Sequence, residues 1–298
     1  MIIDLDKIKQ QKSIQELLEF SIIIFDKPAG MTSHDVCQMV EMALGLRKAS
    51  HFGTLDLQVT GVLPIALNRG CKLTGDFIGH DKTYTGVMQF HAPILRKDVE
   101  EMIRKKFLGK ITQKPPVRSS VKRVEREREV KRFEILEQNG KDFTFIAEVQ
   151  GGTYIRKLID DLGIALGITA HMISLRRIQA GIFLEQDKRF TTKEQFFKAV
   201  KAWKEGEDEL LREILIPAEI VSELYPVVQL KKEFVSKVLL GLPPRKEMFV
   251  KFPDLDKGER IVIFCGEKFI ETATIIKEGK NFVKPEFVLQ PFSALKKQ

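Results

Sequence analysis

Residues 51–67 read His-Phe-Gly-Thr-Leu-Asp-Leu-Gln-Val-Thr-Gly-Val-Leu-Pro-Ile-Ala-Leu, and they place one carboxylate, Asp56, in a short loop ahead of an apolar run. Gly53 and Gly61 stand on either side of this acid. Glycine allows backbone conformations that bring the main chain close to a ligand. An aspartate after Gly-Thr-Leu is usually a turn or helix-capping residue, so this stretch alone does not establish a site. The pattern does indicate an acid that is presented rather than buried.

Further motifs follow one another along the chain. They are D-K-P-A-G-M-T-S at 26–33, K-T-Y at 82–84, K-P-P-V-R-S-S-V-K at 114–122, G-T-Y-I-R at 152–156 and L-R-R at 175–177. Together with G-T-L-D-x-x-x-[ST]-G-V-L-P at 53–64, this series resembles the signature of the TruB and dyskerin family of RNA pseudouridine synthases. The resemblance covers about residues 22–183 and continues more weakly beyond them.

Length and composition describe a globular protein rather than a membrane protein. The chain has 298 residues, of which 43% are hydrophobic and 30% charged, enough for a large core and two domains. It contains no apolar run of membrane-spanning length, and its start lacks the order of a signal peptide. We therefore expect an intracellular location. The family resemblance implies the cytoplasm for an archaeal protein and the nucleolus for a eukaryotic one. The three cysteines are widely separated, which suggests neither a disulfide framework nor a zinc site.

The net charge of +8 makes an anionic partner plausible. Seven basic and three acidic residues lie between Arg118 and Arg132. Such a run is more often a solvated surface than a binding site. RNA is nevertheless its natural partner, because Lys and Arg contacts to phosphate release counterions.

Local patterns predict helices and strands in alternation. We expect strands at 21–25 and 83–91, a hairpin of 130–138 and 143–149 around Asn139-Gly140, and helices at 14–20, 98–107 and from 155 onward. Thr32 and Asp35 form a capping box for a further helix that Gly45 ends. Pro115 and Pro116 begin an extended segment.

From Tyr225 onward the texture changes to short strands joined by Gly and Pro turns, which resembles a PUA domain, the small β-barrel with which family members grip RNA. We expect an α+β protein with a mixed, largely antiparallel central sheet flanked by helices in the catalytic domain. The expected divisions are an N-terminal segment packed on the PUA domain (1–20), the catalytic domain (21–220) and the PUA domain (221–298).

The resemblance also implies the roles of individual residues. Asp56 would be the catalytic acid, acting as nucleophile, electrostatic stabiliser or acceptor of a ribose proton, and we leave these routes open. Tyr84 would stack on the flipped uracil, and Arg156, in the first turn of its helix, would pair with Asp56. The other residues implied to contact substrate are His51, Tyr154, Leu175, Lys27 and Lys122, the two lysines through the backbone or pocket. No cofactor or metal is expected.

Two residues depart from the family pattern. Leu57 stands where the family usually has proline, and Phe52 where it usually has a small or polar residue. Either change could loosen the loop that carries Asp56.

The segment K-P-P-V-R-S-S-V-K-R resembles the dyskerin form, and the absence of lysine-rich tails favours an archaeal member. The resemblance thus implies the catalytic subunit of an H/ACA particle that modifies ribosomal RNA, with transfer RNA left open as a substrate. Its partners would be guide RNA, a small zinc-ribbon-type protein, a glycine-arginine-rich-family core protein and a kink-turn-binding ribosomal-type protein, with no membrane. The alternatives are a guide-independent synthase acting on the tRNA T-arm and a non-catalytic RNA-binding scaffold.

Overall fold

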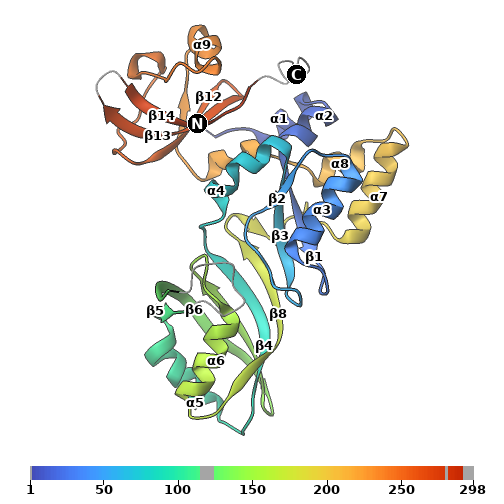
Figure 1. Ribbon diagram of the computed structural model, residues 1–298, viewed down its shortest axis with the longest axis vertical. Helices are drawn as coiled ribbons and strands as arrows, with labels where there is room; N and C mark the ends of the chain where they lie inside the picture. Colours follow the sequence, from blue (N-terminus) through green and yellow to red (C-terminus); the bar gives the residue numbers. More distant parts are fainter. Residues whose placement is uncertain (1, 115–123, 279–280, 291–298) are drawn as a thin grey trace.

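The computed structural model describes residues 2–114, 124–278 and 281–290. Its strands form two sheets (Figure 1). Along the larger sheet the order is β10 (Ile216–Pro217), β1 (Ser21–Lys27), β3 (Thr60–Leu67), β8 (Ala170–Ala180), β4 (Lys82–Phe90), β7 (Asp142–Val149), β6 (Arg126–Asn139) and β5 (Gly109–Gln113). Two short strands lie off this path: β2 (Ala49–His51) pairs with β3, and β9 (Phe183–Leu184) pairs with β8. The smaller sheet runs β11 (Val227–Gln229), β12 (Arg260–Cys265), β13 (Lys268–Glu278) and β14 (Asn281–Val288).

Helices cover the faces and ends of these sheets (Figure 1). They are α1 (Leu5–Gln11), α2 (Ile14–Glu19), α3 (Ser33–Leu44), α4 (Thr74–Phe77), α5 (Arg96–Met102), α6 (Ile155–Ala165), α7 (Lys193–Lys204), α8 (Glu209–Ile214) and α9 (Val235–Leu239). None of the helices in the described part of the chain has the length and apolar character needed to span a bilayer.

The larger sheet consists of two halves that meet at a narrow junction. β3 and β8 run parallel and pair through only two residue pairs, Thr60 with Arg176 and Gly61 with Arg177. Strands β1, β2 and β10 lie on the β3 side, and β4, β5, β6 and β7 lie on the β8 side. Most of the other pairings are antiparallel, which confirms the expected mixed, largely antiparallel sheet. Groups that meet at this junction come from distant parts of the sequence.

The predicted elements are found with small shifts of their ends. The strand expected at 21–25 is β1, and the hairpin around Asn139-Gly140 is β6 and β7. Thr32 and Asp35 form the expected capping box of α3, and Gly45 ends that helix in the left-handed conformation.

Other expectations need correction or fall outside the described residues. A helix that we did not expect, α1, precedes α2 in the N-terminal segment. The helix expected at 98–107 is α5 followed by a turn of π-helix, Ile103–Phe107. The extended segment at Pro115 and Pro116 lies outside the part of the chain that the structure describes.

The N-terminal helices contact the C-terminal sheet (Figure 1). The ring centroids of Phe20 and Phe269 are 5.3 Å apart, and Lys7 forms an ion pair with Glu267 at 2.7 Å. Ile3 and Ile8 are buried in the same apolar cluster as Phe264. Because this cluster also contains residues of β1 and β3, it joins the C-terminal sheet to the larger one.

The C-terminal sheet is open within the described residues. Its strands pair in the order β11, β12, β13 and β14, and no pairing between β14 and β11 closes it into a barrel. A separate apolar cluster lies on this sheet and includes Val228, Ile263 and Ile275. The described strands therefore do not form the closed β-barrel that the resemblance implied.

One side chain of this sheet predicts a pH dependence of stability. Glu271 on β13 is fully buried, and neither carboxylate oxygen has a hydrogen-bond partner among the described groups. Burial raises the pKa of this carboxyl to about 8. Between the unfolded value near 4.5 and 8, the folded protein holds a proton that the unfolded chain releases. Stability therefore falls as pH rises through this window, by about 5 kcal/mol in total.

We expect Glu271→Gln to remove this loss, because the amide does not titrate. Denaturant unfolding of both proteins at pH 5 and pH 8 measures it, since the difference between them isolates Glu271 from other titrating groups. A wild-type slope equal to that of the variant would show that the carboxyl is ionised in the folded protein.

Candidate active site

The loop that carries Asp56 is held through its main chain. The hydroxyl of Ser33, the first residue of α3, accepts from Leu55 N at 2.8 Å and donates to Leu55 O at 3.2 Å. The ammonium of Lys27 donates to Val59 O at 2.7 Å and to Leu57 O at 3.2 Å. Because these contacts use main-chain atoms, they leave the side chain of Asp56, which is 54% exposed, available for other partners.

The partner of Asp56 comes from the other half of the sheet. Arg156 is the second residue of α6, and its Nε lies 2.9 Å from Asp56 Oδ2. We expected a specific anion beside a cation in the first turn of a helix, where the dipole disfavours positive charge. Both side chains are more than half exposed, so the pair adds little to stability. It orients the carboxylate across the junction.

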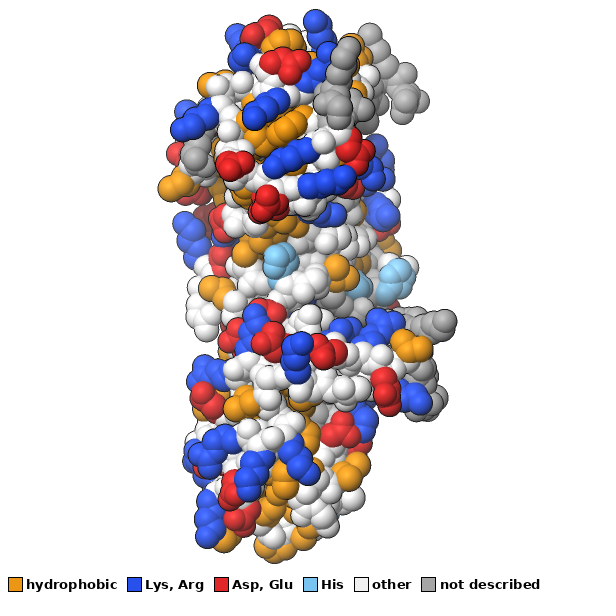
Figure 2. All heavy atoms as spheres, turned by 90° about the vertical axis from the view of Figure 1, so that its left-hand side faces the viewer, with side chains coloured by type: hydrophobic (Ala, Val, Ile, Leu, Met, Phe, Trp, Pro, Cys, Tyr) orange, Lys and Arg blue, Asp and Glu red, His pale blue; other side chains and the backbone are white. Residues whose placement is uncertain are grey.

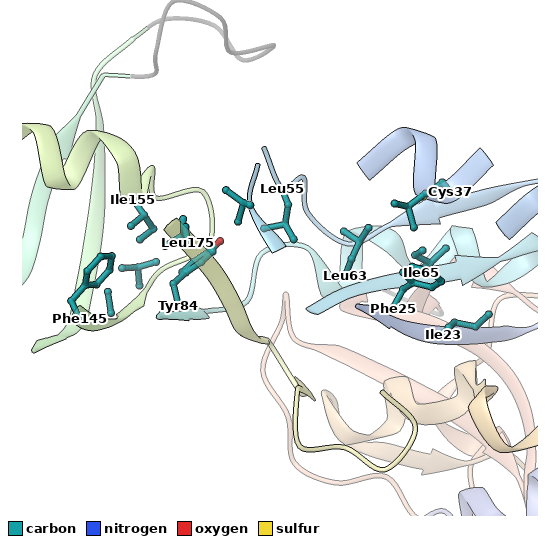
Figure 3. Close-up of a cluster of buried hydrophobic side chains, with 14 of the residues drawn as sticks. Ile23, Phe25, Cys37, Leu55, Leu63, Ile65, Tyr84, Phe145, Ile155 and Leu175 are labelled. Atoms are coloured by element: carbon teal, nitrogen blue, oxygen red, sulfur yellow. The ribbon is translucent and has the colours of Figure 1, made fainter. Parts of the chain in front are cut away.

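Apolar side chains lie beneath the acid. Leu55, Tyr84 and Leu175 are buried members of one cluster, from the Asp56 loop, β4 and β8 respectively. Figure 3 shows Leu55 between the group around Tyr84 and Leu175 and the group around Leu63 and Phe25. Asp56 therefore lies at the edge of an aromatic and aliphatic surface of the kind on which a base can stack.

Tyr154 caps the start of α6 and is tied to β5. Its backbone N donates to Gln113 Oε1 at 3.0 Å, and Gln113 Nε2 donates to Tyr154 O at 3.2 Å. Gln113 is 4% exposed, so these two hydrogen bonds are shielded from solvent. Lys122 lies outside the described residues.

His51 and Lys27 lie on strands next to the loop, His51 on β2 and Lys27 at the end of β1. His51 is half-buried on β2, and its Nδ1 has no hydrogen-bond partner among the described groups. Burial, reinforced by the nearby guanidinium of Arg177, lowers the pKa of His51, so its imidazole is neutral at neutral pH. Lys27 is fully buried. Its ammonium contacts the main chain of the protein and is not exposed for contact with RNA.

Two buried basic residues beside the loop were not singled out from the sequence. Lys82 donates to Ile78 O at 2.6 Å, and burial lowers the pKa of its ammonium to about 8. Arg177, 1% exposed, donates to Val62 O and Gly53 O. Both belong to motifs that we had quoted, K-T-Y and L-R-R, so a basic residue next to a pocket residue was the available signal.

Both departures from the family pattern are accommodated. Phe52 is 1% exposed and stacks on Phe77 with ring centroids 4.7 Å apart, beside Phe183. Leu57 is 47% exposed, and the loop uses its carbonyl, which accepts from Lys27 and from Gly30 N. The doubt that these residues loosen the loop therefore finds no support in its contacts.

At least two of the four basic residues in the described part of the basic segment pair with acids. Lys131 contacts Asp81, and Arg132 contacts Glu134. On the face of the molecule shown in Figure 2, Lys and Arg are likewise interspersed with Asp and Glu. No group of three or more potential metal-binding side chains gathers in the parts of the chain that are described.

The sequence and the fold both match known proteins. The profile of the N-terminal domain of the TruB family pseudouridylate synthases matches residues 41–155, and that of the tRNA pseudouridylate synthase B C-terminal domain matches 156–222. A protein named probable tRNA pseudouridine synthase B from Methanocaldococcus jannaschii is 37% identical over 85% of this chain and 75% of its own length. One of the same name from Nanoarchaeum equitans is 42% identical over 85% of this chain and 72% of its own.

Solved structures agree. A chain of a Cbf5-Nop10-Gar1 complex superposes with a TM-score of 0.87 at 32% identity, covering 96% of this chain and 89% of that one. A chain of an H/ACA RNP bound to a substrate RNA containing 2'-deoxyuridine superposes with a TM-score of 0.85 at 30% identity, covering 95% and 89%.

The matching profiles and relatives show the class of this protein, an enzyme that isomerises a uridine in RNA. The chain belongs to the TruB family of pseudouridine synthases.

Pseudouridine formation has chemical demands that this arrangement can meet. The bond from C1′ to N1 breaks, the uracil turns, and C5 bonds to C1′ while the C5 proton leaves to solvent and N1 gains one. Positive charge develops at C1′ as the first bond breaks, so a carboxylate near the sugar favours the transition state. A detached base held against the buried side chains of Leu55, Tyr84 and Leu175 would be shielded from water.

Tyr84 tests the stacking surface. Its side chain is 9% exposed on β4, so an ordinary core role would also fit its position. We expect Tyr84→Phe to bind RNA normally and Tyr84→Leu to lose much more activity, because stacking contributes on the order of 1–3 kcal/mol per base. Turnover and RNA affinity of both variants measure this. Equal activity of the Phe and Leu variants would leave Tyr84 as a strand residue only.

Proposed function

We propose that this synthase is the catalytic subunit of an H/ACA guide ribonucleoprotein that isomerises uridines in ribosomal RNA. The observation that carries the proposal is the extent of the structural similarity. The superposition on the chain of the Cbf5-Nop10-Gar1 complex covers 96% of the chain, and so includes the C-terminal sheet with the catalytic half. A guide RNA would then choose the uridine, and the enzyme itself would read little sequence.

Two of the proposed partners follow from the same comparison. Guide and substrate RNA would bind with small accessory proteins of the kinds found in the Cbf5-Nop10-Gar1 complex. The family resemblance adds a kink-turn-binding protein. The C-terminal sheet would act as a PUA-type grip on the guide RNA. An archaeal particle of this kind would work in the cytoplasm.

A guide-independent tRNA synthase remains the second candidate, since the curated relatives carry that name. The test assays tritium release from C5-labelled uridine in two substrates, a guide-complementary ribosomal RNA fragment and a transfer RNA. Each is given to the chain alone and with guide RNA and accessory proteins.

Release from the ribosomal fragment only with its guide supports the proposal. Equal release from transfer RNA without any guide would replace it with the second candidate. Guide RNA that binds tightly while neither substrate releases tritium would indicate a scaffold.

A further inference from the structure

Arg177 is the largest fully buried side chain among the described residues. Arg177 lies on β8 at the junction with β3, where its backbone pairs with that of Gly61. Its guanidinium donates from Nε to Val62 O at 2.8 Å and from Nη2 to Gly53 O at 3.1 Å. The two carbonyls flank the loop that carries Asp56: Gly53 lies before it, and Val62 lies in β3 just after it.

The partners of Arg177 are unusual for a buried cation. Among the described residues no carboxylate lies within ion-pairing distance of it, whereas its neighbour Arg176 pairs with both Asp26 and Glu185. A buried charge without a counter-charge is costly. Its field reaches the surroundings, because Arg177 adds to the effect of burial in lowering the pKa of both His51 and Lys82. Core packing alone would be served better by an apolar side chain.

We propose that Arg177 is a positioning residue that sets the place of Asp56 in the active site. The planar guanidinium contacts the main chain on both sides of the loop at once, which a single ammonium cannot do in the same geometry. Lys27 holds the middle of the loop by donating to Leu57 O and Val59 O. Asp56 is thereby fixed from β8, the strand that also carries Leu175, so the acid and the base pocket share one support.

Gly53 is part of the same contact. It adopts a φ of +111°, and a Cβ at this position would lie 3.6 Å from Arg177 Nη1. The main chain is therefore close against the guanidinium, with its carbonyl turned toward it. A displacement of about 1 Å at a reacting group can cost on the order of 10²-fold in rate. Loss of this contact would shift the loop enough to slow catalysis.

The test compares Arg177→Met and Arg177→Lys with Arg212→Met. Arg212 also donates to main-chain carbonyls, those of Lys9 and Lys12, but it lies on α8 away from the site. It therefore controls for the general loss of an arginine that holds a loop. The inference rests on the isomerase activity of this site and not on guide dependence.

The first readout is hydrogen exchange of the full-length proteins without RNA. We expect Arg177→Met to speed exchange of the Phe52 and Val59 amides, which bond to Pro64 O and Asp56 O, and to leave the β1 and β3 ladder protected. Arg212→Met should leave both amides unchanged. Unchanged exchange at Phe52 and Val59 in Arg177→Met would overturn the proposal, whatever RNA the enzyme uses.

The second readout is single-turnover isomerisation at saturating RNA, in the assembly in which the wild-type chain is active. We expect the rate constant of Arg177→Met to fall on the order of 10²-fold, with the reaction amplitude unchanged and RNA affinity within about threefold. Arg177→Lys should recover part of the rate. A lower amplitude at the wild-type rate constant would mean partial unfolding and would overturn the proposal, as would a wild-type rate in Arg177→Met.

Discussion

Asp56→Asn is expected to abolish isomerisation and to leave RNA binding nearly intact. The amide keeps the shape of the side chain and removes the charge that stabilises the breaking sugar bond, a term that acts on the transition state rather than on binding. Loss of a principal catalytic group typically costs 10⁴-fold or more, so turnover should fall by about that factor. Stability should change by less than about 1 kcal/mol, because the pair with Arg156 is largely exposed.

Asp160→Asn is the matched control. Asp160 is 55% exposed on α6 and pairs with Lys157 three residues earlier. The Asp160→Asn variant therefore loses a similar surface ion pair on the helix that carries Arg156. Single-turnover rates and RNA affinities of the two variants are compared under the same conditions. Measurable turnover by a homogeneous Asp56→Asn preparation would remove Asp56 from the mechanism.

Gly61→Ala is expected to destabilise the protein by about 3 kcal/mol or more and to inactivate it. A Cβ at Gly61 would lie 2.2 Å from Arg177 O, which is backbone and cannot move aside without separating β3 from β8. Its φ of +100° adds backbone strain for any other residue. Since the pairing of these strands involves two residue pairs, the clash opens the junction on which Asp56 and Arg156 meet.

Gly258→Ala separates the two causes. Gly258 has a nearly equal φ of +95° with no atom within 4 Å of an added Cβ, so only the strain is shared. Denaturant unfolding and turnover of both variants measure the difference. Equal loss of stability in the two would show that the close approach of the strands at Gly61 is not important.

Local sequence signals anticipated much of the fold. The Asn139-Gly140 turn and the Thr32 capping box are complete within a few residues, so their chemistry can be seen in the sequence. The Gly-Thr-Leu-Asp loop indicated a presented acid, and the family motifs gave that acid its role and its partner Arg156. Residue types at short spacing were enough for these.

Features that depend on distant contacts were missed. Arg177 is ordinary as a sequence feature and gains its role only when β8 lies beside the Asp56 loop. Phe52 looked unfavourable until Phe77 and Phe183 formed its aromatic surroundings. Likewise, the π-helical turn Ile103–Phe107 interrupts a pattern that reads as continuous helix. Tertiary packing decides all three, and it is not written in local periodicity.

The most direct test of the account is whether the wild-type chain converts uridine to pseudouridine. RNA labelled with tritium at C5 of the target uridine is incubated with the chain, guide RNA and accessory proteins. The amount of released tritium and the amount of pseudouridine recovered from the digested RNA are then measured in the same samples. We expect equal amounts of both, rising until the target uridine is consumed. If neither tritium release nor pseudouridine were found, with this substrate or with transfer RNA, the assignment of the chain as a pseudouridine synthase would be wrong.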